Sequence, residues 1–265
     1  MLRKNVEKAK SQYDDVPAIY SKLITSCYRR VNQLIDLEYE KCISEAKDKT
    51  VLDVACGDGR YTKMMLDKGA RLVVGVDESE QMIRICRERI ASKRLILRAA
   101  DISRFDLADI KNSSGEPLSY DLVYTFAFWH YLPTSDIIRS TASNLSLRLT
   151  PEGTLYALVL DSDYIPCWSN MLNVWSQRHD SMTLTDGDPI YWNYRYEGKW
   201  LFPQNILSYY WHNDSLKQLL EGAGLKEELT YNISDANEQT LNDDEFTTLR
   251  VWRISKYTKM RLTLS

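Results

Sequence analysis

Short apolar runs recur along the middle of the chain. They are TVLDVA (50–55), RLVVGVD (71–77), RLILRAAD (94–101), YDLVYTFAF (120–128) and GTLYALVLD (153–161). Each run is bounded by polar residues and is nearly continuous in apolar character, as in strands that are buried on both faces. The pattern therefore predicts five strands of a mostly parallel sheet.

Amphipathic stretches lie between these runs. Apolar residues at three- and four-residue spacing predict helices over 61–68, where Gly69 ends the helix, over 79–90 and over 135–149. A strand that alternates with a helix in this way returns to the sheet through right-handed crossovers. We therefore expect an α/β fold with a doubly wound sheet.

The flanks of this alternation have patterns of their own. Residues 15–46 repeat apolar positions at helical spacing after a pair of aspartates, which predicts an amphipathic N-terminal helix. Toward the C-terminus, a capped helix is expected over 213–221. Two alternating strands are expected over 225–234 and 246–255, joined by a polar loop, and they are predicted to form an antiparallel pair at the sheet edge.

The segment 162–212 interrupts the alternation and is too long for an ordinary loop. The chain has 17 tyrosines and 7 tryptophans, and many of them gather between Tyr191 and Trp211. The expected organisation has four parts, at 1–48 (helical cap), 49–161 (α/β core), 162–212 (insertion) and 213–265 (C-terminal helix and strand pair).

Composition narrows the classes of partner. The formal charge is −3 and no long basic run occurs, so nucleic acid is not an expected partner. No apolar run is long enough to span a membrane and the N-terminus does not read as a signal peptide, so a cytoplasmic protein is expected. The five cysteines include no CxxC pair and there are three histidines, so no metal site is expected.

The loop 55–60 follows the first predicted strand, where open α/β sheets bind their ligands. Gly57 and Gly59 allow a ligand to approach the backbone closely, and the next helix begins immediately. Asp77 ends the second strand and suits hydrogen bonds from ribose hydroxyls. These features suit a nicotinamide dinucleotide as well as other adenosine cofactors.

Two details favour a cofactor other than a dinucleotide. The loop lacks the third glycine of the dinucleotide fingerprint. Asp53 and Asp58 would repel a pyrophosphate and suit a ligand that carries an ammonium and a sulfonium. An NAD(P)-dependent oxidoreductase remains the alternative.

Five segments resemble, in the correct order, four motifs of class I S-adenosylmethionine-dependent methyltransferases and the turn into their fifth strand. VLDVACGDGRY (51–61) is similar to the first motif, and GVDES (75–79) to the acidic ribose-binding motif. AADI (99–102) resembles the adenine-binding segment, and YDLVYTF (120–126) with LTPEGTL (149–155) resembles the fourth motif and the turn into the fifth strand. The resemblance implies a seven-stranded sheet with an antiparallel last strand.

The resemblance also implies the cofactor and its binding residues. The cofactor is S-adenosylmethionine, and the product is S-adenosylhomocysteine. The implied cofactor-binding residues are Asp53, Ala55, Cys56, Gly57, Gly59, Tyr61, Asp77, Glu78, Met82, Asp101, Ile102, Thr125 and Phe126.

Within this class, the chain is most similar to enzymes that act on small molecules. It lacks the Asp/Asn-Pro-Pro-Tyr/Phe motif of nucleic acid amino-methylating enzymes and the double-glutamate hairpin of protein arginine methyltransferases. The segment 208–225 and YDDVPAIY near the start resemble methyltransferases of ubiquinone biosynthesis and the toxoflavin-synthase-like kind. A small, planar metabolite methylated on nitrogen or oxygen is therefore expected.

Two residues are candidates for a catalytic role. His130 follows the fourth strand, where the acceptor would lie, and could act as a base; the alternative is a structural histidine bonded to backbone. Tyr20, like Tyr13, resembles N-terminal tyrosines that close over the cofactor, and its alternative role is core packing.

The aromatic run favours a lid over the acceptor, with hairpin packing as the alternative. The candidate substrate residues are Trp129, Tyr194, Tyr210 and Trp211. A non-catalytic protein that binds S-adenosylmethionine remains a further possibility, because methyl transfer needs little catalytic machinery. The acceptor and the oligomeric state stay open.

Overall fold

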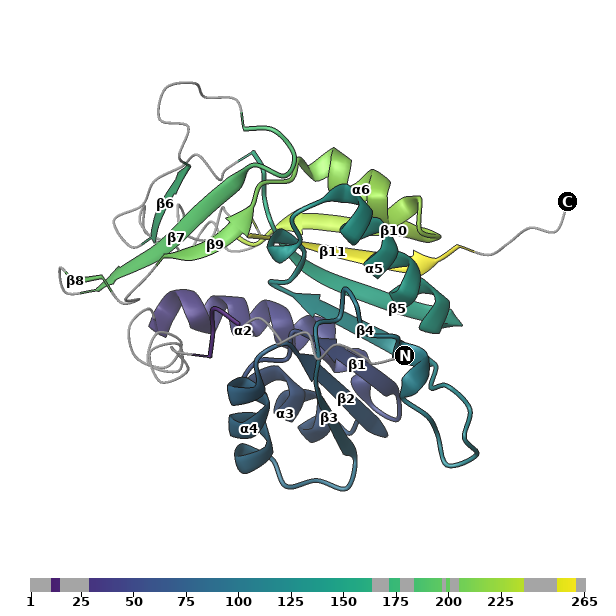
Figure 1. Ribbon diagram of the computed structural model, residues 1–265. Helices are drawn as coiled ribbons and strands as arrows, with labels where there is room; N and C mark the ends of the chain where they lie inside the picture. The colour runs from purple at the N-terminus through teal and green to yellow at the C-terminus, as the bar shows by residue number, and fades with distance from the viewer. Residues whose placement is uncertain are drawn as a thin grey trace, which may run out of the picture.

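A seven-stranded sheet forms the centre of the computed structural model (Figure 1), which describes residues 11–14, 29–163, 172–176, 184–196, 199–200, 205–235 and 252–260. The strands lie in the order β10 (Leu225–Asn232), β11 (Trp252–Lys259), β5 (Leu149–Leu160), β4 (Tyr120–Phe126), β1 (Thr50–Val54), β2 (Leu72–Asp77) and β3 (Leu95–Ala99). β3, β2, β1, β4 and β5 run parallel, and β11 is antiparallel to both of its neighbours. The predicted α/β fold with a reversed last strand is confirmed.

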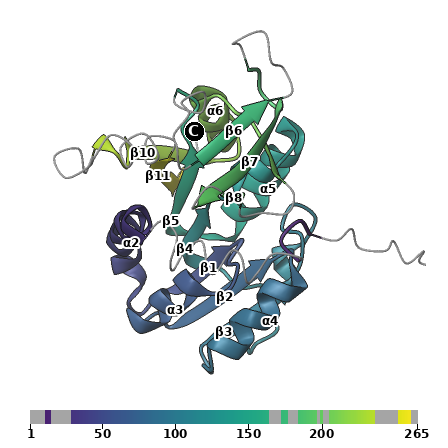
Figure 2. The same ribbon diagram turned by 90° about the vertical axis from the view of Figure 1, so that its left-hand side faces the viewer.

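Helices cover both faces of this sheet. On one face, α2 (Arg29–Ile43), α3 (Arg60–Asp67) and α4 (Glu80–Arg89) bury side chains against one side of β1 and β2. On the other face, α5 (Ser135–Arg148) and α6 (Asn213–Glu221) pack in the same way. Figure 2 shows α2 and α3 on one side of the sheet and α5 on the other. Burial on both faces explains why the strands read as continuous apolar runs.

The predicted helices and strands agree with the structure to within two residues, except in three places. β5 begins at Leu149, because residues that were expected to form a turn already pair with Tyr120 before the register shifts to Leu122 opposite Thr154. The end of the predicted strand 246–255 is four residues too early, because β11 runs to Lys259 in register with β5. Residues 246–251 lie outside the described part of the chain. Of the predicted helix 15–46, the structure describes α2 and the short turn Ser44–Ala46.

The segment between β5 and α6 carries a small second sheet. It contains β6 (Leu172–Ser176), β7 (Pro189–Tyr196), β8 (Lys199–Trp200) and β9 (Ile206–Tyr209). β7 pairs antiparallel with the other three, and the predicted aromatic hairpin is present where Tyr196 pairs with Lys199. β9 contacts the short turn Trp129–Tyr131 that follows β4, so this sheet adjoins the carboxyl end of the main sheet.

No helix in the described ranges is both long and apolar enough to cross a membrane.

Candidate active site

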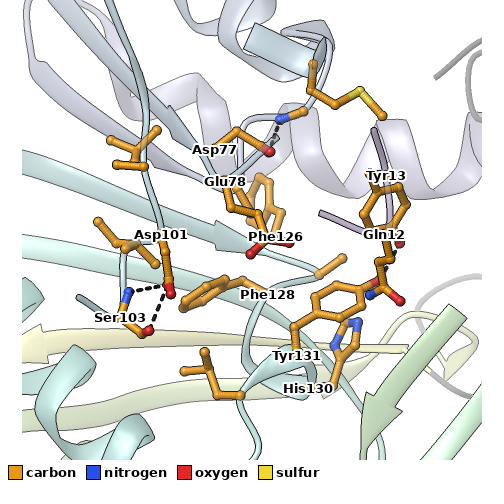
Figure 3. Close-up of a pocket in the computed structure, with 18 of the residues that line it drawn as sticks. Gln12, Tyr13, Asp77, Glu78, Asp101, Ser103, Phe126, Phe128, His130 and Tyr131 are labelled. Carbon is orange, nitrogen blue, oxygen red and sulfur yellow. Dashed lines mark hydrogen bonds between the residues drawn. The ribbon is translucent and has the colours of Figure 1, made fainter. Parts of the chain in front are cut away.

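A cavity of about 330 Å³ lies at the carboxyl ends of the central strands (Figure 3). Gly57 after β1, Asp77 at the end of β2, Asp101 after β3 and Phe126 at the end of β4 all line it. The winding of the sheet reverses between β1 and β4, which is where open α/β sheets leave room for a ligand. Sequence-distant motifs therefore meet at one site.

The two glycines of the loop after β1 have different roles. Both have left-handed backbone, with φ of 54° at Gly57 and 84° at Gly59. A Cβ built on Gly57 has no atom within 4 Å, and Gly57 lines the cavity. A Cβ on Gly59 would lie 2.3 Å from Sγ of Cys86 on α4. Gly57 therefore opens the cavity, whereas Gly59 lets the loop pack against α4.

Asp77 joins the two loops that border the cavity. Its Oδ2 accepts a hydrogen bond of 2.8 Å from the Gly57 amide, and its Oδ1 accepts one of 2.9 Å from the Ser79 amide. Burial raises the pKa of Asp77 to about 6, although these two amides oppose the shift. Each carboxylate oxygen has a second lone pair, so the group can still accept hydrogen bonds from a ligand.

The two acids that favoured a cationic ligand lie just behind the cavity. Asp53 is buried and accepts a 2.5 Å hydrogen bond from Thr62 Oγ1, and burial raises its pKa to about 7. Asp58 forms a 2.7 Å ion pair with Arg89. Neither acid is among the described residues that line the cavity. Asp58 is thus largely neutralised by the protein itself, which weakens its part of the sequence argument.

The loop after β3 forms one end of the cavity. Asp101 Oδ1 accepts hydrogen bonds from the amide of Ser103 (3.0 Å) and its hydroxyl (2.7 Å), and Asp101 Oδ2 lies 3.4 Å from Arg104 Nε. Ile102 and Met82 are buried and line the same region. An acid beside apolar side chains suits a flat ring that carries an amino group.

Eight of the thirteen predicted cofactor residues line this cavity: Ala55, Gly57, Asp77, Glu78, Met82, Asp101, Ile102 and Phe126. The other five, Asp53, Cys56, Gly59, Tyr61 and Thr125, are not among the described lining residues. They belong to β1, the loop after it, α3 and β4, close in sequence to lining residues. Tyr61 donates a hydrogen bond to Asp36 on α2, and Thr125 accepts one from Trp129 Nε1.

The other end of the cavity contains His130 and Tyr131. His130 is only 5% exposed, and burial lowers its pKa to about 3, so the imidazole is uncharged at neutral pH. Its Nδ1 is buried without a hydrogen-bond partner, so it does not make the backbone bond that was one alternative for this residue. The role of His130 as a base stays a prediction.

Three of the four predicted substrate residues are described and do not line the cavity. Trp129 is fully buried and donates to Thr125, Trp211 donates to the Leu132 carbonyl oxygen at 3.0 Å, and Tyr210 donates to the Ser162 carbonyl oxygen at 3.4 Å. None of the three is among the described lining residues. The Tyr194 side chain and the whole of Tyr20, the second catalytic candidate, lie outside the described part of the chain.

A short segment, residues 11–14, crosses the cavity and was not expected to do so as a unit. Ser11 Oγ donates to Glu78 at 2.7 Å, and Asp14 accepts a 2.5 Å hydrogen bond from Ser79 Oγ. Gln12 exchanges two hydrogen bonds with the backbone of Leu207 in β9. We call residues 11–14 the strap, because they connect the β2 loop to the small sheet.

Other lining residues come from distant parts of the chain. Ile206 belongs to β9 and Trp252 begins β11, while Tyr13 of the strap has its hydroxyl 2.5 Å from that of Tyr131. No local motif marks Ile206 or Trp252. Tyr13 was expected near the cofactor because it resembles N-terminal tyrosines that close over it, and Tyr131 directly follows His130.

Comparison with known proteins agrees with this geometry. Residues 51–153 match a family described as a methyltransferase domain. Residues 51–153 of this chain are thus similar to methyltransferase domains. The matched residues run from β1 into the start of β5 and include the loops with Gly57, Asp77 and Asp101.

Curated relatives match about the same share of the chain. A tRNA U34 carboxymethyltransferase of Actinobacillus pleuropneumoniae is 30% identical over 47% of this chain and 37% of its own length. A ubiquinone biosynthesis O-methyltransferase of Neisseria meningitidis is 28% identical over 45% of this chain and 48% of its own length. The chain thus matches less than half the length of either relative.

Solved structures share the fold over most of the chain. The CcbJ methyltransferase of Streptomyces caelestis has a TM-score of 0.65 at 16% identity, covering 95% of this chain and 99% of its own. An S-adenosylmethionine-dependent methyltransferase of Listeria monocytogenes, described as putative, has a TM-score of 0.61 at 17% identity, covering 85% and 96%. The methyltransferase fold thus extends beyond the matched family segment.

The family implies S-adenosylmethionine as cosubstrate, and the residues of the cavity fit it. Gly57 leaves open space beside the loop, Asp77 presents a carboxylate, and Asp101 with Ile102 forms an acidic and apolar end. These groups suit the amino acid moiety, the ribose and the adenine, respectively.

Binding of S-adenosylmethionine is expected to weaken as the pH falls. Burial raises the pKa of Asp77 to about 6 and that of Asp53 to about 7, so both acids gain protons between pH 8 and pH 5. A cationic ligand favours the carboxylate forms, so its affinity rises with pH and levels off above these pKa values. Protonation of Asp77 alone is expected to lower the affinity for S-adenosylmethionine about tenfold at pH 5 relative to pH 8.

Calorimetry at pH 8, 7, 6 and 5 measures this dependence, and two buffers of different ionisation enthalpy count the protons released. In Asp77→Asn, the part of the dependence centred near pH 6 should disappear. Equal affinity at all four pH values would contradict the expectation.

Proposed function

We propose that this chain transfers the methyl group of S-adenosylmethionine to a nitrogen or oxygen of a small, planar acceptor. The observation that carries the proposal is that one cavity joins the cofactor-type groups, Gly57, Asp77 and Asp101, to a buried aromatic end at His130 and Tyr131. A dehydrogenase would need the pyrophosphate-binding glycine that the loop lacks.

The roles of the lining residues follow from their chemistry. Asp77 and Glu78 would accept hydrogen bonds from the ribose, Asp101 would receive the adenine amino group, and Met82 with Ile102 would contact the ring. When bound, S-adenosylmethionine supplies a methyl group that its sulfonium has already activated. The protein then has to orient the acceptor, exclude water and receive a proton.

Water exclusion has a physical basis in this fold. Phe126 and Phe128 are buried and line the cavity between its two ends. The strap closes one side through the hydrogen bond between Tyr13 and Tyr131 and the bonds of Gln12 to β9. Such enclosure strengthens interactions of the ligand with nearby charges and aligns the reacting groups.

The relatives do not agree on an acceptor. Their descriptions name tRNA U34, ubiquinone biosynthesis and trans-aconitate. The proposal of a small planar acceptor therefore relies on the aromatic end of the cavity rather than on any relative.

Three measurements test the proposed function. Calorimetry with S-adenosylmethionine and S-adenosylhomocysteine should show binding, whereas a fluorescence titration with NADH should show none. Incubation with methyl-labelled S-adenosylmethionine and a metabolite extract should label a small molecule. Bulk tRNA is the parallel substrate, and labelling of tRNA alone would contradict the small-molecule acceptor. Cofactor binding without labelling of either mixture would favour a non-catalytic protein, and the absence of cofactor binding would refute the proposal.

A further inference from the structure

The far end of the cavity is lined by rings from three separate elements. The His130 ring centroid lies 4.3 Å from that of Tyr131 and 5.8 Å from that of Trp252, which begins β11. Ile206 and Leu132 add aliphatic surface to the same cavity. Figure 3 shows His130, Tyr131 and Tyr13 together at one end and Asp101 with Ser103 at the other. Flat aromatic and aliphatic surfaces of this kind suit a planar molecule.

Among the described residues at this end, Tyr13, Tyr131 and Gln12 use polar side-chain atoms in bonds to the protein, whereas Nδ1 of His130 has no partner. The hydroxyls of Tyr131 and Tyr13 bond to each other at 2.5 Å, and the side-chain amide of Gln12 uses both its oxygen and its nitrogen on the backbone of Leu207. His130 Nδ1 is buried and has no partner. An unpaired buried polar atom costs free energy, so a ligand that bonds to it gains affinity.

The charges around the cavity disfavour an anionic acceptor. Asp77, Glu78 and Asp101 all line it. Among the described lining residues, Arg104 has the one permanent positive charge, but it lies beside Asp101 and its side chain is 84% exposed. An anion at the His130 end would meet no cationic side chain among the described lining residues and would have only the sulfonium of the cofactor as a partner, which S-adenosylhomocysteine lacks.

From these three observations, and resting on the proposed function, we infer that the acceptor is an uncharged planar molecule whose reactive O–H or N–H donates a hydrogen bond to Nδ1 of His130. The bond orients the reactive atom. In the transfer, a lone pair of that atom forms the new bond to the methyl carbon, and the electron pair of the breaking carbon–sulfur bond stays on sulfur. The proton of the acceptor passes to Nδ1.

The neutral His130 ring suits the role of hydrogen-bond acceptor, and because it is a weak base it takes the proton only as the new methyl bond makes that proton strongly acidic. Burial lowers its pKa to about 3, so the ring stays neutral throughout the physiological range. With its single proton on Nε2, the ring presents a lone pair at Nδ1.

Three simple probes separate the features of the inferred acceptor. Phenol is uncharged and has an O–H, anisole is uncharged without one, and benzoate is anionic at neutral pH. The chain has 3 histidines, so the imidazole nitrogens of protein labelled with ¹⁵N-histidine give few NMR signals. With S-adenosylhomocysteine present, phenol should shift the Nδ1 signal of His130 and bind about tenfold more tightly than anisole. Benzoate should not compete with phenol.

Two variants complete the experiment. His130→Phe keeps an aromatic ring but has no Nδ1, so its preference for phenol over anisole should fall to about one. His130→Leu, which also lacks a hydrogen-bond acceptor, assigns the signal and replaces His130→Phe if that variant does not fold. The matched control is His212→Gln, because His212 is exposed, pairs with Asp186 at 3.2 Å and is not among the described lining residues. This control should keep the full preference.

Several results would overturn the inference. They are benzoate binding as tightly as phenol, an unchanged preference in the His130 variants, a shift confined to other histidines, or no binding of phenol at millimolar concentration. Each is distinct from failure of the proposed function, which would appear as the loss of S-adenosylhomocysteine binding itself.

Discussion

Gly59→Ala is expected to lower the free energy of unfolding by about 2 to 4 kcal/mol. Gly59 has a φ of 84°, a conformation that costs an alanine about 1 kcal/mol. The added Cβ would also lie 2.3 Å from Cys86 Sγ and 2.9 Å from Ile90 Cδ1. The loop or α4 has to move, and overpacking of this kind costs about 1 to 3 kcal/mol. Urea unfolding followed by circular dichroism measures the loss.

Two variants make this prediction specific. Gly57 has a φ of 54°, but no described atom lies within 4 Å of a Cβ built on it. Gly57→Ala should therefore lower the free energy of unfolding by only about 1 kcal/mol. Its main effect should be on cofactor affinity, because Gly57 lines the cavity. Adding Cys86→Ala to Gly59→Ala removes the closest clashing atom and should restore part of the stability. Equal losses for the two single glycine variants would mean that packing against α4 is not the cause.

Asp77→Asn is expected to weaken binding of S-adenosylmethionine by about tenfold to a hundredfold, since a hydrogen bond to a charged group contributes about 1.5 to 3 kcal/mol. The amide keeps the shape of the side chain but places an NH₂ group where an oxygen now accepts the Gly57 or Ser79 amide. The variant therefore loses acceptors on both the loop side and the ligand side. Calorimetry at pH 8 gives the affinity.

The matched control for this change is Asp67→Asn. Asp67 is an exposed acid on α3 that pairs with Lys63 at 2.6 Å, away from the cavity. Its replacement should leave cofactor affinity unchanged. Circular dichroism below the unfolding transition shows whether Asp77→Asn is folded during the titration. Unaltered affinity in a folded Asp77→Asn protein would remove Asp77 from the cofactor site.

The sequence was sufficient to predict the core because local pattern and tertiary role agree there. Every residue of β1 is buried, and the strand is apolar except for Thr50 and Asp53. Asp77 ends β2 directly beside the loop to which it bonds. The end of β11 was predicted too early because Lys256, Thr258 and Lys259 are polar and interrupt the apolar pattern. Pairing with β5 and β10 keeps these residues in the strand. Such non-local pairing leaves no periodic signal.

The aromatic residues were harder to interpret. Trp129 and Trp211 were expected at the acceptor, yet both donate their indole N–H within the core. A large ring with one polar atom suits a buried structural position as well as a binding surface, and composition cannot separate these roles. Ile206 and Trp252 reach the cavity through the packing of the small sheet and the reversed strand.

The strap links the two halves of the site energetically. Ser11 and Asp14 bond to the loop that borders the ribose position, while Gln12 and Tyr13 bond to β9 and to Tyr131. A cofactor that makes this short segment more ordered would spare the acceptor part of the same entropic cost. By reciprocity, the acceptor would tighten cofactor binding by an equal factor. Four residues would then couple the two affinities through the protein, in addition to the contact that the ligands make at the transferred methyl group.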